Sequence, residues 1–219
     1  MRALAFLSTE RRELFSGAVW PEPGTALGEG AIGLRGPQVL TRMDDELWVV
    51  ELDEPLADRG DVVVAAGGTL VEQVVAWDDA TAREFALACV DRVRSLACDA
   101  LRRAGGAEPE SLIGLPRAAY AEAAVALAPR LPQRLASAIL FAADIDALAQ
   151  GLRPEEYGLQ PDPNGASRPA AIAANVAFVA AHAAGSVSPD GHDAGFAAER
   201  AWQLDWLEQR LGLETRPAG

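Results

Sequence analysis

The sequence contains no lysine, so all 19 of its basic residues are arginines. Without a lysine amine the chain cannot form a Schiff base with pyridoxal phosphate, and it cannot complete a phosphate-binding P-loop. The 32 acidic residues give a net charge of −13, and no basic stripe offsets this excess. Because nucleic acids and anionic membranes attract cationic side chains, we expect neither of them as a partner.

Cysteine is scarce, and the chain shows no long apolar run. The two cysteines, Cys89 and Cys98, lie nine positions apart in one predicted helix. That spacing puts them on opposite faces, where they can share neither a disulfide nor a metal. The apolar run at residues 3–7 is too short for a signal peptide, and Asn175 interrupts the alanine-rich run near 170–184. These features predict a cytoplasmic protein without a membrane span.

Histidine is equally scarce, with two residues in the whole chain. His182 falls in an apolar predicted helix, where a hydrogen-bonded core or edge histidine is the usual finding. His192 falls in a glycine-rich turn, and a metal site built on both histidines would need carboxylates such as Asp190 and Asp193. We therefore predict no metal and no cofactor, and keep His182 as a candidate catalytic residue.

The N-terminal third has the pattern of a small β-sheet. Short apolar or alternating segments are separated by glycine, proline and aspartate turns, and such short connections favour antiparallel pairing. In this prediction Pro55 ends the third strand and residues 58–61 form a turn. The predicted strands cover residues 3–7, 31–34, 47–52, 62–66 and 70–75. The Gly28-x-Gly30-x-x-Gly33 pattern is not a dinucleotide site, because no solid strand precedes it and Pro37 blocks the required helix.

The remainder of the chain has helical periodicity. Asp78 or Asp79 can cap the first helix, and Thr81 and Glu84 have the spacing of a capping box. The predicted helices cover residues 79–104, 117–128, 132–150, 169–184 and 194–211. We therefore predict an α+β protein in which a small, mainly antiparallel sheet is followed by an alanine-rich helical bundle. Residues 1–78 form the β-rich domain, 79–213 form a bundle that is separate from or continuous with the sheet, and 214–219 form a frayed tail.

Three stretches resemble a group of uncharacterised actinobacterial proteins. They are Asp44 to Leu52, Leu70 to Asp78, and Ala198 to Leu213. The N-terminal part of that group is similar to a small domain of unknown function that also occurs in phage and plasmid proteins. Its alanine-rich helical tail is similar to the tails of predicted immunity-type proteins. The resemblance implies no established activity.

Members of that group carry a Gly-Val-His-Ala-Cys phrase before the Asp-Asp-Glu-Leu-Trp strand. The corresponding positions here are Gly30 to Leu34, where Ile32 and Leu34 replace the histidine and the cysteine. Two interpretations remain open. Either this chain has lost a chemistry that the phrase supports in its relatives, or the phrase is structural and the two apolar residues keep its packing.

The densest group of large, polar-tipped side chains lies in the last predicted helix. Glu199 and Arg200 are candidate catalytic residues, and Trp202, Gln203 and Trp206 are candidate ligand- or partner-binding residues. Tryptophan and arginine are enriched at interaction hot spots, although tryptophans that wedge a helix onto the core are the more common case. Trp48 and Tyr157 complete the candidate binding set. Asp144 and Asp146 are two positions apart and do not share a helix face, so we predict solvated acids there and not a magnesium site.

The leading functional hypothesis is a non-catalytic cytoplasmic binding or structural protein. Its acidic surface would receive a basic protein partner, as in a phage-related or immunity-type component. The alternative is an enzyme or a binder of a nucleotide or metabolite, with a pocket between the sheet and the helices worked by His, Glu and Arg side chains. A remote form of that alternative is a degenerate nucleotide-binding fold related to the ADP-ribosyltransferases. The sequence gives no oligomeric state.

Overall fold

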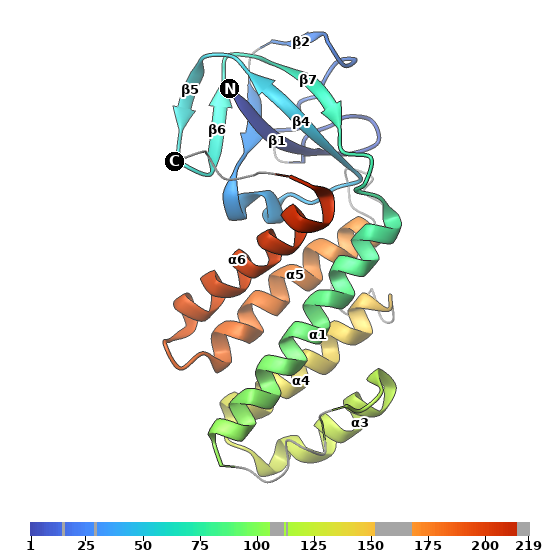
Figure 1. Ribbon diagram of the computed structural model, residues 1–219, viewed down its shortest axis with the longest axis vertical. Coiled ribbons are helices and arrows are strands. Elements are labelled where there is room, and N and C mark those ends of the chain that lie inside the picture. The colour runs from blue at the N-terminus through green and yellow to red at the C-terminus, as the bar shows by residue number, and fades with distance from the viewer. Residues whose placement is uncertain (15, 29, 106–111, 113, 152–167, 214–219) are drawn as a thin grey trace. The chain divides into compact units, whose positions relative to one another are not determined.

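The computed structural model describes residues 1–14, 16–28, 30–105, 112, 114–151 and 168–213. Its element order confirms the α+β class, since an antiparallel sheet is followed by helices (Figure 1). The described residues fall into two compact units. The sheet unit draws on Met1–Arg83, Leu159–Ala174 and Leu204–Gly219, and the helical unit draws on Glu84–Gly158 and Asn175–Gln203. Three helices therefore contribute residues to both units.

The sheet has seven strands in the order β2-β7-β4-β1-β3-β6-β5, and every neighbouring pair is antiparallel. The strands are β1 (Arg2–Leu7), β2 (Ala26–Leu27), β3 (Ala31–Leu34), β4 (Glu46–Leu52), β5 (Pro55–Asp58), β6 (Val62–Ala65) and β7 (Gly68–Gln73). The central pair, β1 and β4, runs in register from Arg2 opposite Glu51 to Leu7 opposite Glu46. The predicted mainly antiparallel sheet is therefore confirmed.

The local prediction was wrong at Pro55, which begins the edge strand β5 instead of ending a strand. Proline has no N–H to donate, but an edge strand needs donors on one side only, so the residue is tolerated there. β7 also starts two residues earlier than predicted, at Gly68. A Cβ at Gly68 would lie 3.1 Å from the carbonyl oxygen of Glu51, so the close approach of β4 accounts for the glycine. The sequence also did not predict β2 or the 3-10 helix η1 (Gly36–Thr41).

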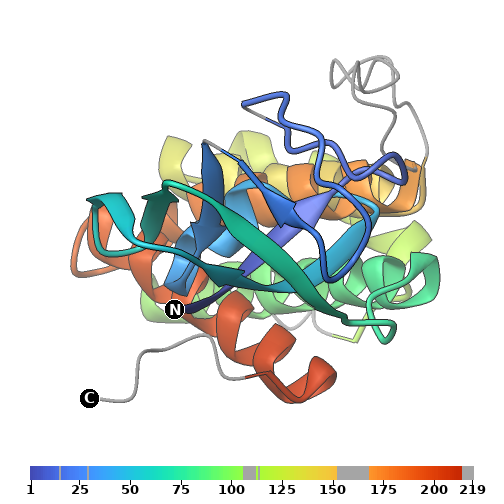
Figure 2. The same cartoon turned by 90° about the horizontal axis from the view of Figure 1, so that it is seen from above.

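Alternate residues of the strands form one continuous core on the inner face of the sheet. Figure 2 shows that the sheet is strongly twisted, with its strands crossing one another. Trp20, from the loop after β1, is 1% exposed and belongs to the same core. The other members are Ala3, Ala5, Leu7, Ala31, Trp48, Val50, Leu52, Val63, Ala65 and Leu70. In β4 the alternation predicted from the sequence is present, since Trp48, Val50 and Leu52 all belong to this core.

The outer face of the sheet is covered in part by the segment that leads into the first helix. The rings of Phe6 and Trp77 meet edge to face with their centroids 5.2 Å apart. The indole N–H of Trp77 donates to the main-chain oxygen of Asp44 at 2.8 Å, so the buried indole is satisfied. Val39 and Leu40 of η1 are also buried. These contacts leave other parts of the outer face exposed.

The named helices are α1 (Asp79–Arg103), α3 (Arg117–Leu127), η2 (Ala128–Arg130), α4 (Gln133–Ala149), α5 (Arg168–Val187) and α6 (His192–Leu211). The predicted cap is present at the start of α1, where the Thr81 N–H donates to Asp78 Oδ1 at 2.8 Å. α6 begins two residues before its predicted start. His192, which the sequence placed in a turn, is therefore the first residue of a helix.

The core of the helical unit consists mainly of small side chains. Phe85, Cys89 and Val93 of α1 are at most 1% exposed, as the helical stripe predicted. In α5 the stretch Pro169–Val187 has a mean hydropathy of 1.6, which is long and apolar enough for a membrane span by composition, contrary to the sequence-based expectation. However, 56% of its window is buried inside the protein, as is typical of a core helix.

Candidate functional site

Three polar residues of α6 are buried inside the helical unit. Glu199 is 1% exposed, Arg200 is 5% exposed and Gln203 is completely buried. Gln203 lies four positions after Glu199 and three after Arg200, so both of these side chains can reach it along the helix. Two ionisable side chains, those of Glu199 and Arg200, are therefore withdrawn from water in this helix.

Gln203 connects the members of this group, which we call the Gln203 network. Its Oε1 accepts from Arg200 Nη1 at 3.1 Å. Its Nε2 donates to the main-chain oxygen of Ala177 on α5 at 2.9 Å and to Glu199 Oε1 at 3.4 Å. The Gln203 amide is therefore hydrogen-bonded to a cation, to an anion and to the main chain of a neighbouring helix. Such a network fixes the facing surfaces of α5 and α6 more firmly than small apolar side chains alone.

Arg92 of α1 extends the Gln203 network toward solvent. Its Nε lies 3.4 Å from Glu199 Oε2, and its guanidinium carbon lies 5.3 Å from the centre of the Trp202 ring. The Arg92 side chain is 39% exposed, whereas that of Glu199 is 1% exposed. The Trp202 ring therefore makes a cation–π contact with Arg92. The same guanidinium compensates the charge of the buried Glu199 carboxylate.

Burial changes the pKa values of the charged members of the Gln203 network. Desolvation raises the pKa of Glu199 to about 7, although the neighbouring Arg92 opposes the shift. Desolvation also lowers the pKa of Arg200 to about 10. A carboxyl group with a pKa near neutrality could transfer protons. However, Glu199 is 1% exposed and is bonded to Arg92 and Gln203, so its surroundings favour a structural role.

The other candidate residues from the sequence lie elsewhere. Trp48 is a core residue of the sheet unit, and its Nε1 donates to Glu46 Oε2 at 2.9 Å. Trp206 also belongs to the sheet unit, and Tyr157 lies outside the described residues. His182 is exposed on α5. Of the candidates from the sequence, the structure therefore groups Glu199, Arg200, Trp202 and Gln203 in the helical unit.

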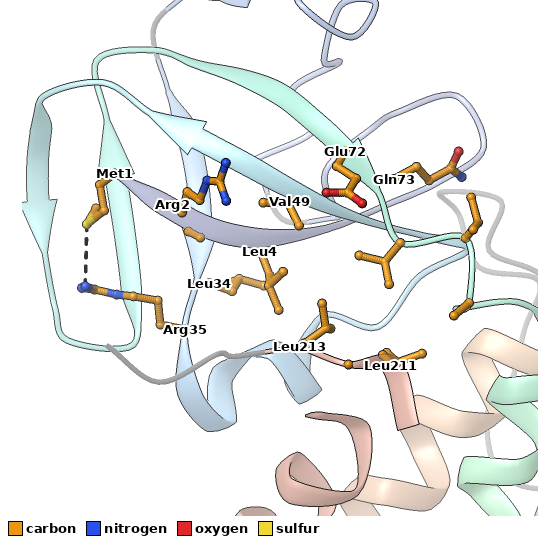
Figure 3. A pocket seen from close by; sticks show the side chains of 15 residues that line it. Met1, Arg2, Leu4, Leu34, Arg35, Val49, Glu72, Gln73, Leu211 and Leu213 are labelled. Atoms are coloured by element: carbon orange, nitrogen blue, oxygen red, sulfur yellow. Dashed lines mark hydrogen bonds between the residues drawn. The ribbon is translucent and has the colours of Figure 1, made fainter. Parts of the chain in front are cut away.

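The sheet unit contains a groove of about 730 Å³ on its outer face. Leu4, Leu34 and Val49 form its apolar floor on neighbouring strands, with Leu4 paired to both of the others. Figure 3 shows Leu213 approaching from the opposite wall, beyond the end of α6. The rest of the lining is Met1, Arg2, Ala3, Arg35, Glu72, Gln73, Val74, Val75, Ala76, Leu211 and Gly212. Leu34, which the sequence left open as a structural residue, is thus an apolar floor residue.

The charged groups of this groove are spread around its rim. Arg35 Nη2 lies 2.7 and 2.8 Å from the two carboxylate oxygens of Asp58, so that cation is already paired. The Gly60 N–H and Arg35 together lower the pKa of Asp58. The Met1 ammonium donates to the Leu52 oxygen at 2.7 Å. The rim offers no paired general acid and base among the described residues, and the sequence gave no direct sign of the groove.

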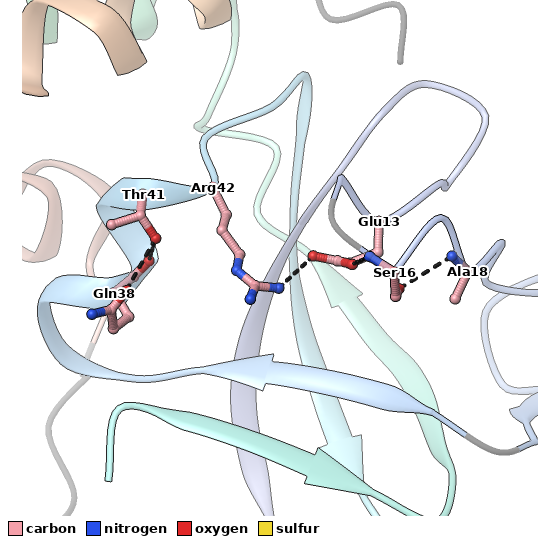
Figure 4. A network of polar contacts seen from close by, with 6 residues as sticks. All are labelled: Glu13, Ser16, Ala18, Gln38, Thr41 and Arg42. Atoms are coloured by element: carbon pink, nitrogen blue, oxygen red, sulfur yellow. Dashed lines mark hydrogen bonds and ion pairs between the residues drawn. The ribbon is translucent and has the colours of Figure 1, made fainter. Parts of the chain in front are cut away.

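A second ion pair, between Glu13 and Arg42, ties two loops of the sheet unit together. Arg42 Nη1 lies 2.6 Å from Glu13 Oε1, and the two side chains are 16% and 4% exposed (Figure 4). Glu13 Oε2 also accepts from the Ser16 N–H. The carboxylate is thus bound on both sides, which identifies it as a structural group that holds the loop after β1.

Replacing Glu13 with glutamine should lower the free energy of unfolding by about 2 kcal/mol, because Arg42 would lose its buried counter-charge. Glu22 offers a matched control. It is also 2.6 Å from an arginine, Arg11, but its side chain is 74% exposed. Glu22→Gln should cost less than about 0.5 kcal/mol. Equal losses in the two variants, measured by chemical denaturation, would show that burial does not set the strength of these pairs.

The acidic pair in α4 splits between two environments. Asp144 is exposed, whereas Asp146 is 4% exposed and lies 3.6 Å from Arg117 Nε. Desolvation raises the pKa of Asp146. The two carboxylates therefore do not share a helix face. Within the described residues no group of three or more His, Cys, Asp or Glu side chains could hold a metal ion.

Comparisons with protein-family models, with curated proteins and with solved structures found no match.

Proposed function

We propose that the chain is a non-catalytic binding protein whose sheet unit receives an extended, basic segment of a protein partner in the outer-face groove. The observation that carries the proposal is the form of that groove. Its apolar floor lies on neighbouring strands, and among the described residues its rim has no general acid paired with a general base. The resemblance to phage-related and immunity-type proteins is consistent with such a component. A cytoplasmic location is part of the same proposal.

The end of β7 supports an extended ligand. β2 pairs with Gly68 and Thr69, and the Gly24 N–H donates to the Leu70 oxygen at 3.1 Å, so among the described residues this segment covers β7 as far as Leu70. Val71 is 42% exposed and Val75 is 78% exposed. Val75 also lines the groove. An incoming strand could pair with this edge and place alternate side chains into the groove, as in other cases of β-strand addition.

The charge of the surrounding surface favours a basic segment. Glu51 and Glu72 are exposed on the same outer face, since Val49 lies opposite Glu72 and two residues before Glu51. Neither carboxylate forms an ion pair with a described residue. Together with the net charge of −13, these acids would attract and orient arginine or lysine side chains.

A small-molecule site in the same groove is the second candidate. Its volume of about 730 Å³ lies within the range typical of ligand pockets. In that case Arg2 and Glu72 on the rim would orient a nucleotide or metabolite. A thermal shift with such a compound that is lost in Arg2→Ala would support this second function and overturn the first.

A direct test uses a fluorescein-labelled peptide of alternating arginine and valine, whose binding is followed by fluorescence anisotropy. We expect the double variant Glu51→Arg/Glu72→Arg to weaken binding at least tenfold, since two attractive charges become repulsive. Between about 0.1 M and about 1 M salt the screening length falls from about 10 Å to about 3 Å, so affinity should also fall.

Glu122→Arg is the matched control, because Glu122 is an exposed acid on α3 in the helical unit. It should leave peptide affinity within about twofold of the parent, because Glu122 does not line the groove. An equal loss in Glu122→Arg would mean that the peptide responds to net charge alone. That result, or the absence of any binding, would overturn the proposal.

A further inference from the structure

The two histidines of the chain meet where α5 and α6 are joined. Figure 1 shows these helices as neighbours connected by a short turn. His182 lies in the last turns of α5, and His192 is the first residue of α6. Both are exposed, and His182 Nδ1 lies 3.3 Å from His192 Nε2. Residues ten positions apart thus present two imidazole nitrogens to each other at the surface.

Several neighbours hold the two rings in this arrangement. The His182 ring contacts Phe178 and Phe196 edge to face, with centroid distances of 4.6 and 4.9 Å. Gly185 provides the space for His192, because a Cβ there would lie 2.8 Å from His192 Cδ2 and 3.0 Å from Nε2. The pair is therefore positioned by packing and by a glycine, and not only by its own hydrogen bond.

We propose that His182 and His192 form a two-histidine site for a divalent transition metal such as Zn²⁺ or Ni²⁺. Two imidazole nitrogens bound to one tetrahedral zinc at about 2.0–2.1 Å lie roughly 3.3 Å apart. The observed separation of 3.3 Å matches that distance. The ion takes the place of the hydrogen that the two nitrogens share, and small rotations of the exposed rings direct both lone pairs at it.

The carboxylate of Asp193 supports this assignment. Its Oδ1 lies 3.4 Å from His192 Nδ1, on the side of the ring away from His182. A proton held on Nδ1 by that carboxylate leaves the lone pair of Nε2 free for a metal, as in other carboxylate–histidine–metal arrangements. His182 binds through Nδ1 when its proton resides on Nε2. Water fills the remaining coordination positions, since the described residues offer no third ligand.

The composition of the chain makes this site easy to isolate experimentally. It has no histidine other than these two, and Cys89 and Cys98 are both buried. The double variant His182→Asn/His192→Asn therefore removes every imidazole while leaving the core untouched. Because both histidines are exposed, the single and double variants should fold like the parent, which circular dichroism can verify.

The test is a titration of the untagged chain with ZnCl₂, and separately NiCl₂, by isothermal calorimetry near neutral pH. We expect one ion per chain, and at least a tenfold loss of affinity in each single variant. Asp193→Asn should weaken binding several-fold, whereas Asp190→Asn, which changes an exposed carboxylate of the same turn, should not. Nuclear magnetic resonance should show both imidazoles shifting together on addition of zinc.

Two outcomes would overturn the proposal. One is binding no stronger in the parent than in the histidine-free variant, which would leave the pair as a hydrogen-bonded contact only. The other is a single variant that binds as tightly as the parent, or a zinc-induced shift confined to one imidazole, because a bridging ion requires both.

Discussion

Replacement of Gln203 with methionine is expected to lower the free energy of unfolding by about 3 kcal/mol. Methionine has nearly the size and shape of glutamine but neither of its polar atoms. The variant removes the bonds to Arg200, to Glu199 and to the Ala177 oxygen without opening a large cavity. Hydrogen bonds to charged groups contribute about 1.5–3 kcal/mol each, and the buried Arg200 cation would lose its acceptor.

Gln209 provides the matched control for this variant. It lies six residues further along α6 and is exposed. Gln209→Met should change stability by less than about 0.5 kcal/mol, as is usual for surface substitutions. Chemical denaturation followed by circular dichroism measures both variants. If Gln203→Met were as stable as the parent, the Gln203 network would not hold α5 and α6 together.

Glu199 is expected to make the stability of the parent fall as the pH rises. Its pKa is about 7 in the folded protein, against 4.5 for an ordinary glutamate, so the folded state binds the proton more tightly than the unfolded chain. The resulting stabilisation is fully present below about pH 4.5 and is lost as the pH rises through about 7. Between pH 5 and pH 8 this contribution should decrease by about 2 to 3 kcal/mol.

Glu199→Gln isolates this contribution, because glutamine resembles the protonated carboxyl group and does not titrate. The stability difference between variant and parent should therefore move in favour of the variant by about 2 to 3 kcal/mol between pH 5 and pH 8. Denaturation curves at several pH values measure it. Parallel pH profiles of the two proteins would contradict a raised pKa at Glu199 and would also remove the case for its deep burial.

Local patterns in the sequence were sufficient for most of the fold. The short apolar run of β1 and the alternation in β4 predicted a sheet, and helical spacing from Asp79 onward predicted helices that begin and end within a few residues of their observed bounds. The cap at Asp78 was visible because helix starts have a local chemistry. The sequence did not predict β5, because proline is tolerated within a strand mainly at the edge of a sheet. No local pattern indicates which strand lies at the edge.

The sequence also selected part of the Gln203 network, because Glu199, Arg200 and Gln203 are neighbours along one helix. It could not show that they are buried, since burial depends on Ala177 and Arg92, which come from other helices. The same holds for the meeting of His182 and His192 across a helix turn and for the groove over Leu4, Leu34 and Val49.

The amino-acid sequence by itself determined the acidic charge, the absence of lysine chemistry, the α+β order of elements and the scarcity of metal ligands. Composition and short-range periodicity are sufficient for these properties. Only the tertiary structure decided which polar groups leave water, which imidazoles face each other and where a sheet face stays open. Those properties arise from contacts between residues distant in the chain, whose energies depend on packing and desolvation at sites that several elements build together.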